Sequence, residues 1–135
     1  MLPSALLCNV YVISLIYWSR SAATSIHPCP NIRYAWNLAS KSLSEDYYCP
    51  GISTVLASIL NLGGRPITTM TGNAVNAGRM ISLTHSLGLN RNPAPWKIPR
   101  HEKRMRVRVW WAVLIHDWWY VYASFHILGS FTLQP

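Results

Sequence analysis

The sequence contains few acidic residues and few cysteines, and each shortage limits the classes of protein to which the chain can belong. Four of its 135 residues are Asp or Glu and twelve are Lys or Arg, which gives a formal net charge of +8. Such a balance suits an anionic partner (nucleic acid, a membrane surface or an acidic protein segment), and it equally suits a fragment that has lost acidic neighbours. The three cysteines, Cys8, Cys29 and Cys49, are widely spaced. Free thiols in a reducing compartment therefore fit better than a disulfide framework.

Motifs for phosphate binding, metal binding and catalysis are also missing. The segment Gly63-Gly64-Arg65-Pro66 lacks the Lys-Ser/Thr pair that a phosphate-binding loop needs. His27 and Cys29 are close together, but no zinc-ligand spacing includes them, and the remaining candidate ligands are scattered: His85, His101 and His126. No Ser or Cys stands in a nucleophile context. An enzyme is the least supported class, and no cofactor is expected in this chain.

What the sequence has in quantity is apolar and aromatic side chains. Half of the residues are hydrophobic, 12% are charged, and there are seven Trp and seven Tyr. An ordinary soluble domain has about 25% charged residues. A chain of this length makes one domain at most, with room for a real core. We therefore treat residues 1–135 as a single domain.

The first segment, Met1–Trp18, is nearly all apolar and allows three interpretations. It lacks the basic start of a signal peptide. As a membrane span it only just reaches the required length. The third interpretation is a helix that other helices surround on all sides.

The rest of the chain shows helical periodicity. Apolar residues recur at helical spacing in Ile32–Leu43 and in Gly51–Leu62, which predicts a helical hairpin. A third helix is predicted at Ala74–Leu87 and ends at Gly88. Its small residues Ala74, Ala77 and Gly78 would allow the backbone of another helix to come close. The last helix begins near Pro99 and continues into the 120s. The predicted fold is all-α, with about five helices in an irregular array around the Trp-rich C-terminal helix.

The last helix contains the ambiguous segment Met105–Val109, in which apolar and basic residues alternate as in a strand. We prefer a helix, because one apolar face continues well past this segment. The residues of that predicted core face are Val107, Trp111, Leu114, Trp118 and Val121.

Seven of the twelve basic residues lie between Arg91 and Arg108. Three interpretations stay open for this stretch: contact with phosphates, docking of an acidic segment, or a solvated face that keeps an apolar protein soluble. Glu102 is placed to pair with Arg106 one turn later. The candidate partner-contact face consists of Arg100, Lys103, Arg104, Arg106 and Arg108.

His116 and Asp117 are polar residues in a very apolar helix. Adjacent helix positions do not face one another, which favours a structural role over an acid/base pair. We expect a buried structural role for both, with Arg79 or Arg33 as ion-pair partner of Asp117.

These features together resemble one family. The resemblance is carried by the order of a small-residue helix, Leu-Gly-Leu-Asn-Arg, a Trp-containing linker, Glu-Lys-x-x-Arg-x-Arg-x-Trp-Trp and Ile-His-Asp-x-Trp. The matching residues are Gly88, Leu89, Asn90, Arg91, Trp96, Glu102, Lys103, Arg106, Arg108, Trp110, Trp111, His116, Asp117 and Trp119. This pattern is similar to the fungal-specific transcription factor domain, the middle homology region of fungal zinc-cluster transcription factors.

The resemblance implies regulation of transcription in the nucleus, as a truncated regulatory region that responds to a partner protein or an effector. In that family zinc and DNA are bound by a separate six-cysteine cluster, which three dispersed cysteines cannot build. DNA contact would therefore depend on a module that this chain lacks. The resemblance ends after Trp119, so we interpret the chain as a fragment or truncated product, and exposed apolar surface predicts self-association.

Two alternatives stay open. One is a small membrane protein with spans at Met1–Trp18 and Val107–Leu128, which would place Asp117 in mid-bilayer. The other is nonspecific binding of nucleic acid or an acidic partner through residues 91–108, and binding to nucleic acid would weaken steeply with salt.

Overall fold

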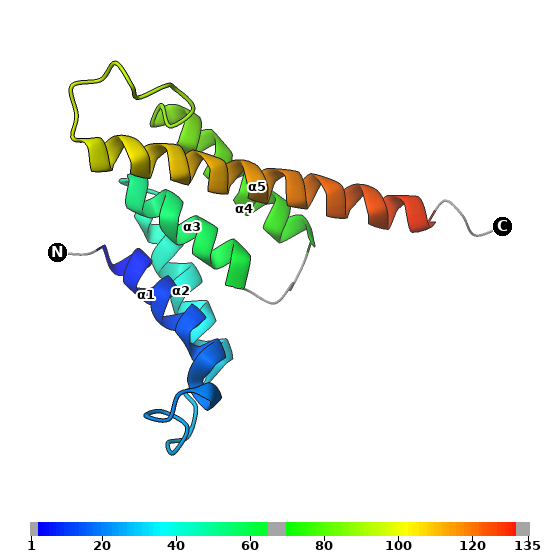
Figure 1. Cartoon of the computed structure of the whole chain (residues 1–135). Helices are drawn as coiled ribbons and strands as arrows, with labels where there is room; N and C mark the ends of the chain where they lie inside the picture. Colours follow the sequence, from blue (N-terminus) through cyan, green and yellow to red (C-terminus); the bar gives the residue numbers. More distant parts are fainter. Residues whose placement is uncertain (1–2, 65–69, 132–135) are drawn as a thin grey trace. The chain divides into compact units, whose positions relative to one another are not determined.

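The computed structural model describes residues 3–64 and 70–131, with side chains at 3–64 and 71–119. Its elements are all helices (Figure 1): α1 Ser4–Ser14, the 3-10 segment η1 Leu15–Arg20, α2 Ile32–Asp46, α3 Ile52–Gly64, α4 Met70–Ser86 and α5 Arg100–Phe131. The predicted all-α class with about five helices is confirmed for these residues. The ambiguous segment Met105–Val109 is helical.

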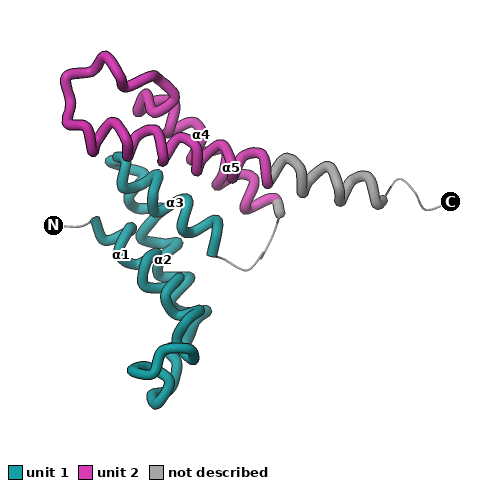
Figure 2. Tube along the Cα trace, in the orientation of Figure 1, with its two compact units in different colours: residues 1–66 teal, residues 67–135 magenta. Residues whose placement is uncertain are grey.

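The helices group into two compact units, residues 1–66 and residues 67–135 (Figure 2). Each unit is described by itself. The expectation that the chain is one domain arranged around its Trp-rich last helix stays a prediction.

Unit 1 is a three-helix cluster in which α1 packs against both α2 and α3. Asn31 is the N-cap residue of helix α2, and its side chain accepts a hydrogen bond of 3.0 Å from the backbone N–H of Tyr34. This satisfies one of the donors that the first turn of a helix leaves unpaired. Two apolar clusters lie between the helices, one around Trp36 and Val12 and the other around Ala5, Leu43 and Ala57.

The third interpretation of the first segment, a helix that other helices surround on all sides, is wrong for α1. Ala5, Asn9 and Val12 are buried, whereas Leu7 and Val10 are about half exposed. An apolar run has no polar face to mark the solvent side, so periodicity could not locate the buried stripe.

A buried polar network joins the three helices of unit 1. Asn61 of α3 donates to the side-chain oxygen of Asn9 at 2.9 Å, and Asn9 donates to the backbone carbonyl of Ala5 at 2.8 Å. Asn61 also reaches Ser40 Oγ of α2 at 3.4 Å. Because a buried amide without partners is costly, these bonds fix how the helices register against one another.

Unit 2 is a helical pair, α4 packed against α5. Helix α4 ends as predicted at Gly88, which has φ +65°. The backbone N–H of Gly88 donates to the His85 carbonyl at 3.0 Å, and that of Leu89 donates to the Thr84 carbonyl at 3.1 Å. This pair of bonds is the Schellman motif, with Leu89 buried beneath it.

The close backbone approach predicted for the small residues of α4 is not observed at Gly78. Ala77 is buried, but Gly78 is exposed, and a Cβ atom added there would meet no atom within 4 Å.

Candidate interaction surface on helix α5

Two of the predicted basic residues hold the loop that precedes α5. Lys103 Nζ donates to the carbonyl of Ala94 at 2.7 Å. The Arg106 guanidinium lies over the Trp96 ring, 5.2 Å from its centroid, and its Nε atom is 3.1 Å from Glu102 Oε1. The predicted Glu102–Arg106 pair is therefore confirmed. These contacts attach residues 94–96 to the first turns of the helix.

The other three residues of the predicted face, Arg100, Arg104 and Arg108, are exposed, whereas Lys103 and Arg106 are partly buried. The structure thus divides the five residues into two that make internal contacts and three that face solvent. Whether this face contacts a partner stays a prediction. Sequence reasoning missed the loop contacts, although Trp96 between two prolines was a signal that the loop is anchored.

The predicted core face of α5 is wrong. The buried side chains are Val109 and Val113, one turn apart. Trp110 lies edge-on to His85 of α4, with ring centroids 5.5 Å apart. On the predicted face, Val107 is 40% exposed, Trp111 60% and Trp118 74%, and the side chain of Val121 lies outside the described residues.

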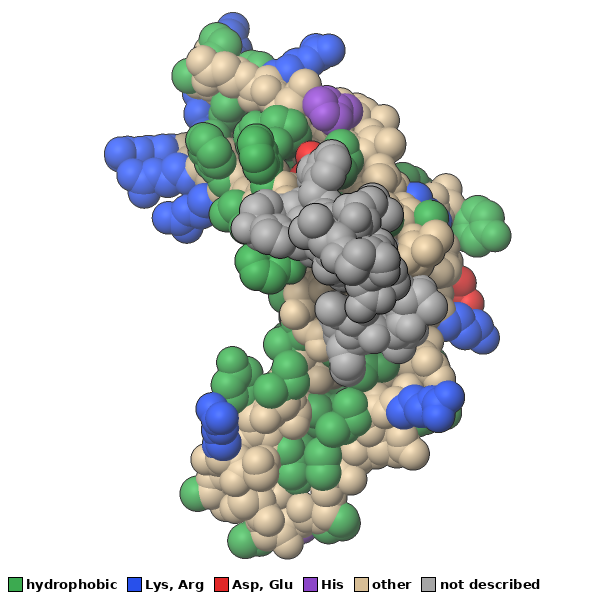
Figure 3. Space-filling model, turned by 90° about the vertical axis from the view of Figure 1, so that its right-hand side faces the viewer, with side chains coloured by type: hydrophobic (Ala, Val, Ile, Leu, Met, Phe, Trp, Pro, Cys, Tyr) green, Lys and Arg blue, Asp and Glu red, His purple; other side chains and the backbone are tan. Residues whose placement is uncertain are grey.

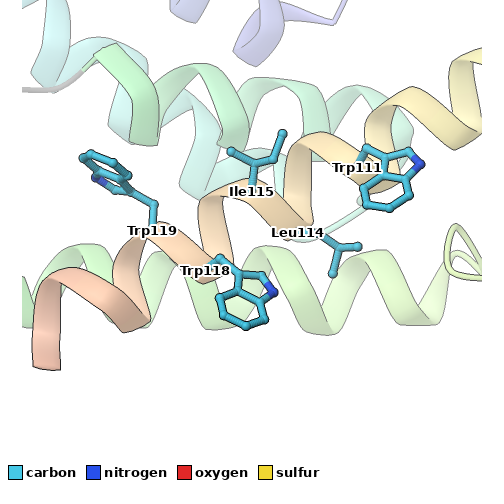
Figure 4. A pocket seen from close by; sticks show the side chains of 5 residues that line it. All are labelled: Trp111, Leu114, Ile115, Trp118 and Trp119. Atoms are coloured by element: carbon cyan, nitrogen blue, oxygen red, sulfur yellow. The ribbon is translucent and has the colours of Figure 1, made fainter.

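The exposed side of α5 carries a hollow of about 380 Å³ with a strongly aromatic lining. Figure 4 shows Ile115 and Trp119 on one side of the helix and Leu114 and Trp118 on the other, with Trp111 one turn earlier. Ile115 is 65% exposed and Trp119 70%. In the space-filling view, hydrophobic and basic side chains lie side by side, and acidic ones are sparse (Figure 3).

His116 and Asp117 are partly exposed rather than fully buried. His116 Nδ1 lies 2.9 Å from the carbonyl of Ala112, one turn earlier. The structural role expected for the two residues, and an ion pair of Asp117 with Arg33 or Arg79, stay predictions.

The cysteines do not fit the six-cysteine zinc cluster of the resembled family. The chain has three, of which Cys29 and Cys49 are exposed and Cys8 is partly buried between α1 and α2. In the described part of the chain no three His, Cys, Asp or Glu side chains are grouped to hold a metal ion. The side chain of His126 lies outside that part.

The membrane alternative rests on spans at Met1–Trp18 and Val107–Leu128. Over the residues that the structure describes, no helix is long and apolar enough to cross a membrane.

The family model of the "Fungal specific transcription factor domain" matches residues 2–123. The chain therefore belongs to this family, which is a family of transcription regulators and not of enzymes.

Two curated relatives agree with this assignment. An uncharacterized transcriptional regulatory protein of Schizosaccharomyces pombe is 35% identical over 118 residues, which are 87% of this chain and 18% of the relative. The transcriptional activator protein DAL81 of Saccharomyces cerevisiae is 29% identical over 119 residues, which are 87% of this chain and 12% of the relative. The chain thus spans less than a fifth of each relative. No solved structure matches it significantly.

Proposed function

We propose that the chain regulates transcription in the nucleus as a protein-binding regulatory segment, and that it neither reads DNA sequence nor catalyses a reaction. The observation that carries this proposal is the family match over residues 2–123, supported by two relatives that are named as transcriptional regulators.

The surface of helix α5 supports binding of a protein more than it supports reading of DNA sequence or catalysis. Helix α5 has three exposed arginines in its first three turns and an open aromatic hollow further along, and such a surface suits a protein partner. Zinc-dependent DNA reading needs ligands that this chain does not supply, so in our proposal it is the work of another module.

The test is to fuse the chain to a DNA-binding domain that has no regulatory activity of its own, and to measure a reporter gene in a fungal host. We expect reporter output to change severalfold, in either direction, compared with the DNA-binding domain alone at equal protein level. An unfolded control is Trp36→Ala, which removes a buried ring at a cost of about 3–5 kcal/mol.

The outcome has two parts. The reporter change should disappear in the Trp36→Ala fusion, because regulation depends on folded helices. Unchanged reporter output from the intact chain, at matched nuclear protein level, would contradict the proposal. Exclusion of a fluorescent fusion from the nucleus would contradict the proposed location.

A further inference from the structure

The side of α5 away from its buried valines carries a continuous stripe of exposed side chains. Arg104, Arg108, Trp111, Ile115 and Trp118 follow one another at alternating spacings of four and three residues, so at about 100° per residue they share one face of the helix, within roughly 40° of its mid-line. Ile115 lies to one side of that mid-line and Trp118 to the other (Figure 4). Because each residue turns the helix by about 100°, Val113 points about 180° away from Arg104. We call these five residues the outer stripe.

The outer stripe has two chemically different halves. Its first half is cationic (Arg104 and Arg108), and its second half is apolar (Trp111, Ile115 and Trp118), with Leu114 and Trp119 beside it. Its ends are fourteen positions apart in the sequence, so the stripe is about 21 Å long at a rise of roughly 1.5 Å per residue. This length matches about four turns of a second helix.

We propose that the outer stripe binds an amphipathic helix of a partner protein whose apolar face ends in acidic residues. The partner's apolar side chains would fill the aromatic hollow, and its carboxylates would pair with Arg104 and Arg108. The inference rests on the proposed function, since it names the kind of partner that a regulatory segment of this shape recognises. A helix laid against a heptad-spaced apolar line is a standard mode of peptide recognition.

Charge complementarity is what specifies an acidic partner. The chain has twelve basic and four acidic residues, and the outer stripe itself contains two arginines and no acid. Guanidinium groups form paired hydrogen bonds with carboxylates, so Arg104 and Arg108 favour two acids about one turn apart. Lys103 and Arg106 are already bonded to Ala94 and Glu102.

A nucleic acid fits this stripe less well than a protein helix. No Lys or Arg follows Arg108 in the sequence, so a strand stacked on Trp111 and Trp118 would find no cations for its phosphates. Asp117, on the same turn as Trp118, would repel them.

The test is a binding measurement with the full chain and a dye-labelled helical peptide of about four turns. The peptide carries Leu at positions i, i+3, i+4 and i+7 and two Glu, one turn apart, at one end; matched peptides carry Gln or Lys in place of Glu. Because the acidic end could be either end of a partner helix, both orientations are made. We expect the Glu peptide to bind at least tenfold more tightly than the Gln peptide, and the Lys peptide to bind least.

Variants of the chain locate the site. Trp118→Ala should weaken binding of the Glu peptide about tenfold or more, because Trp118 lines the aromatic hollow and tryptophans buried by a contact often carry much of its binding energy. Tyr34→Ala, an aromatic residue of α2 that is 69% exposed, is the matched control and should have no effect. The double variant Arg104→Glu/Arg108→Glu should reverse the preference, so that the Lys peptide binds best. Arg33→Glu is the control for charge reversal.

Three results would overturn the inference. One is equal binding of the Glu, Gln and Lys peptides. The second is that a single-stranded oligonucleotide binds more tightly than the Glu peptide and that Trp118→Ala abolishes this binding. The third is a dimer of the chain in sedimentation that Trp118→Ala dissociates, because a second copy would then be the occupant. All these variants change exposed side chains, and circular dichroism checks their helix content. Failure here would leave the reporter result for the proposed function intact.

Discussion

Replacing the buried asparagines of unit 1 tests whether the polar network specifies its packing. Asn9 is 0% exposed and Asn61 is 3% exposed, and the hydrogen bond between their side chains is 2.9 Å long. Leu has the branched shape of Asn without its polar atoms, and its larger methyl groups add a packing cost that enters the single variants and the double variant alike. The single variants Asn9→Leu and Asn61→Leu each leave one buried amide without its partner, whereas the double variant removes both amides together.

The expected loss in free energy of unfolding depends on which buried polar group each variant leaves without a hydrogen-bond partner. A buried polar group that loses its partner costs about 1–3 kcal/mol, so each single variant should lower the free energy of unfolding by about that amount. In Asn61→Leu the Asn9 oxygen loses its donor, and in Asn9→Leu the Asn61 amide keeps only its 3.4 Å contact with Ser40. The double variant should be more stable than the sum of the two losses predicts, by about 1–2 kcal/mol.

The measurement is urea unfolding followed by far-ultraviolet circular dichroism. With a slope of about 2 kcal/mol per molar urea, a loss of about 2 kcal/mol moves the midpoint by about 1 M. Asn37→Leu, at an exposed position of α2, is the matched control and should change stability by less than about 0.5 kcal/mol. Single variants as stable as this control, or strictly additive losses in the double variant, would refute the reasoning.

Further predictions concern three glycines and the basic stretch. Gly78→Ala should stabilise the chain by about 0.5–1 kcal/mol, because the exposed mid-helix site has open space; a loss in the unfolding midpoint would contradict this. Gly88→Ala should cost about 1–2 kcal/mol in the same assay, because φ is +65°, and a neutral result would count against the Schellman end. Gly64→Ala should cost about 1–3 kcal/mol, because its Cβ would lie 2.6 Å from the Ile13 side chain; unchanged stability would show that the contact relaxes freely. If duplex DNA binds nonspecifically through the five exposed cations of residues 91–108 (Arg91, Lys97, Arg100, Arg104 and Arg108), log affinity should fall with log salt with a slope of about −4.5, and a slope near −2.7 would show that only the three arginines on α5 take part.

Helix positions followed from local signals that act within a few residues. Gly88 and Pro99 mark helix ends through backbone conformation, and these signals do not depend on the rest of the fold. The predicted helices at Ile32–Leu43 and Gly51–Leu62 accordingly match α2 and α3 to within a few residues.

The buried faces could not be predicted as well. The segment from Val107 to Trp119 is apolar on several sides, so periodicity allows more than one core face, and Val109 and Val113 are buried where we expected Trp111 and Trp118. The same ambiguity hid the role of Asn9, which looked like an interruption of an apolar run and is instead a buried hydrogen-bonding group. Polar residues in apolar helices are the signal that would have found this network.

The basic residues of α5 show why five similar side chains do not form one surface. Like charges three or four residues apart on a helix repel one another, and the basic residues of α5 follow one another at those spacings. Lys103 and Arg106 offset this cost internally, through the Ala94 carbonyl and the Glu102 carboxylate. In the described part of the chain the structure shows no such acceptor for Arg104 or Arg108, which face solvent beside the aromatic hollow. An acidic amphipathic helix of another protein would pair its carboxylates with this residual charge and cover the tryptophans with its apolar side chains, which is why we treat the two halves of the outer stripe as one binding surface.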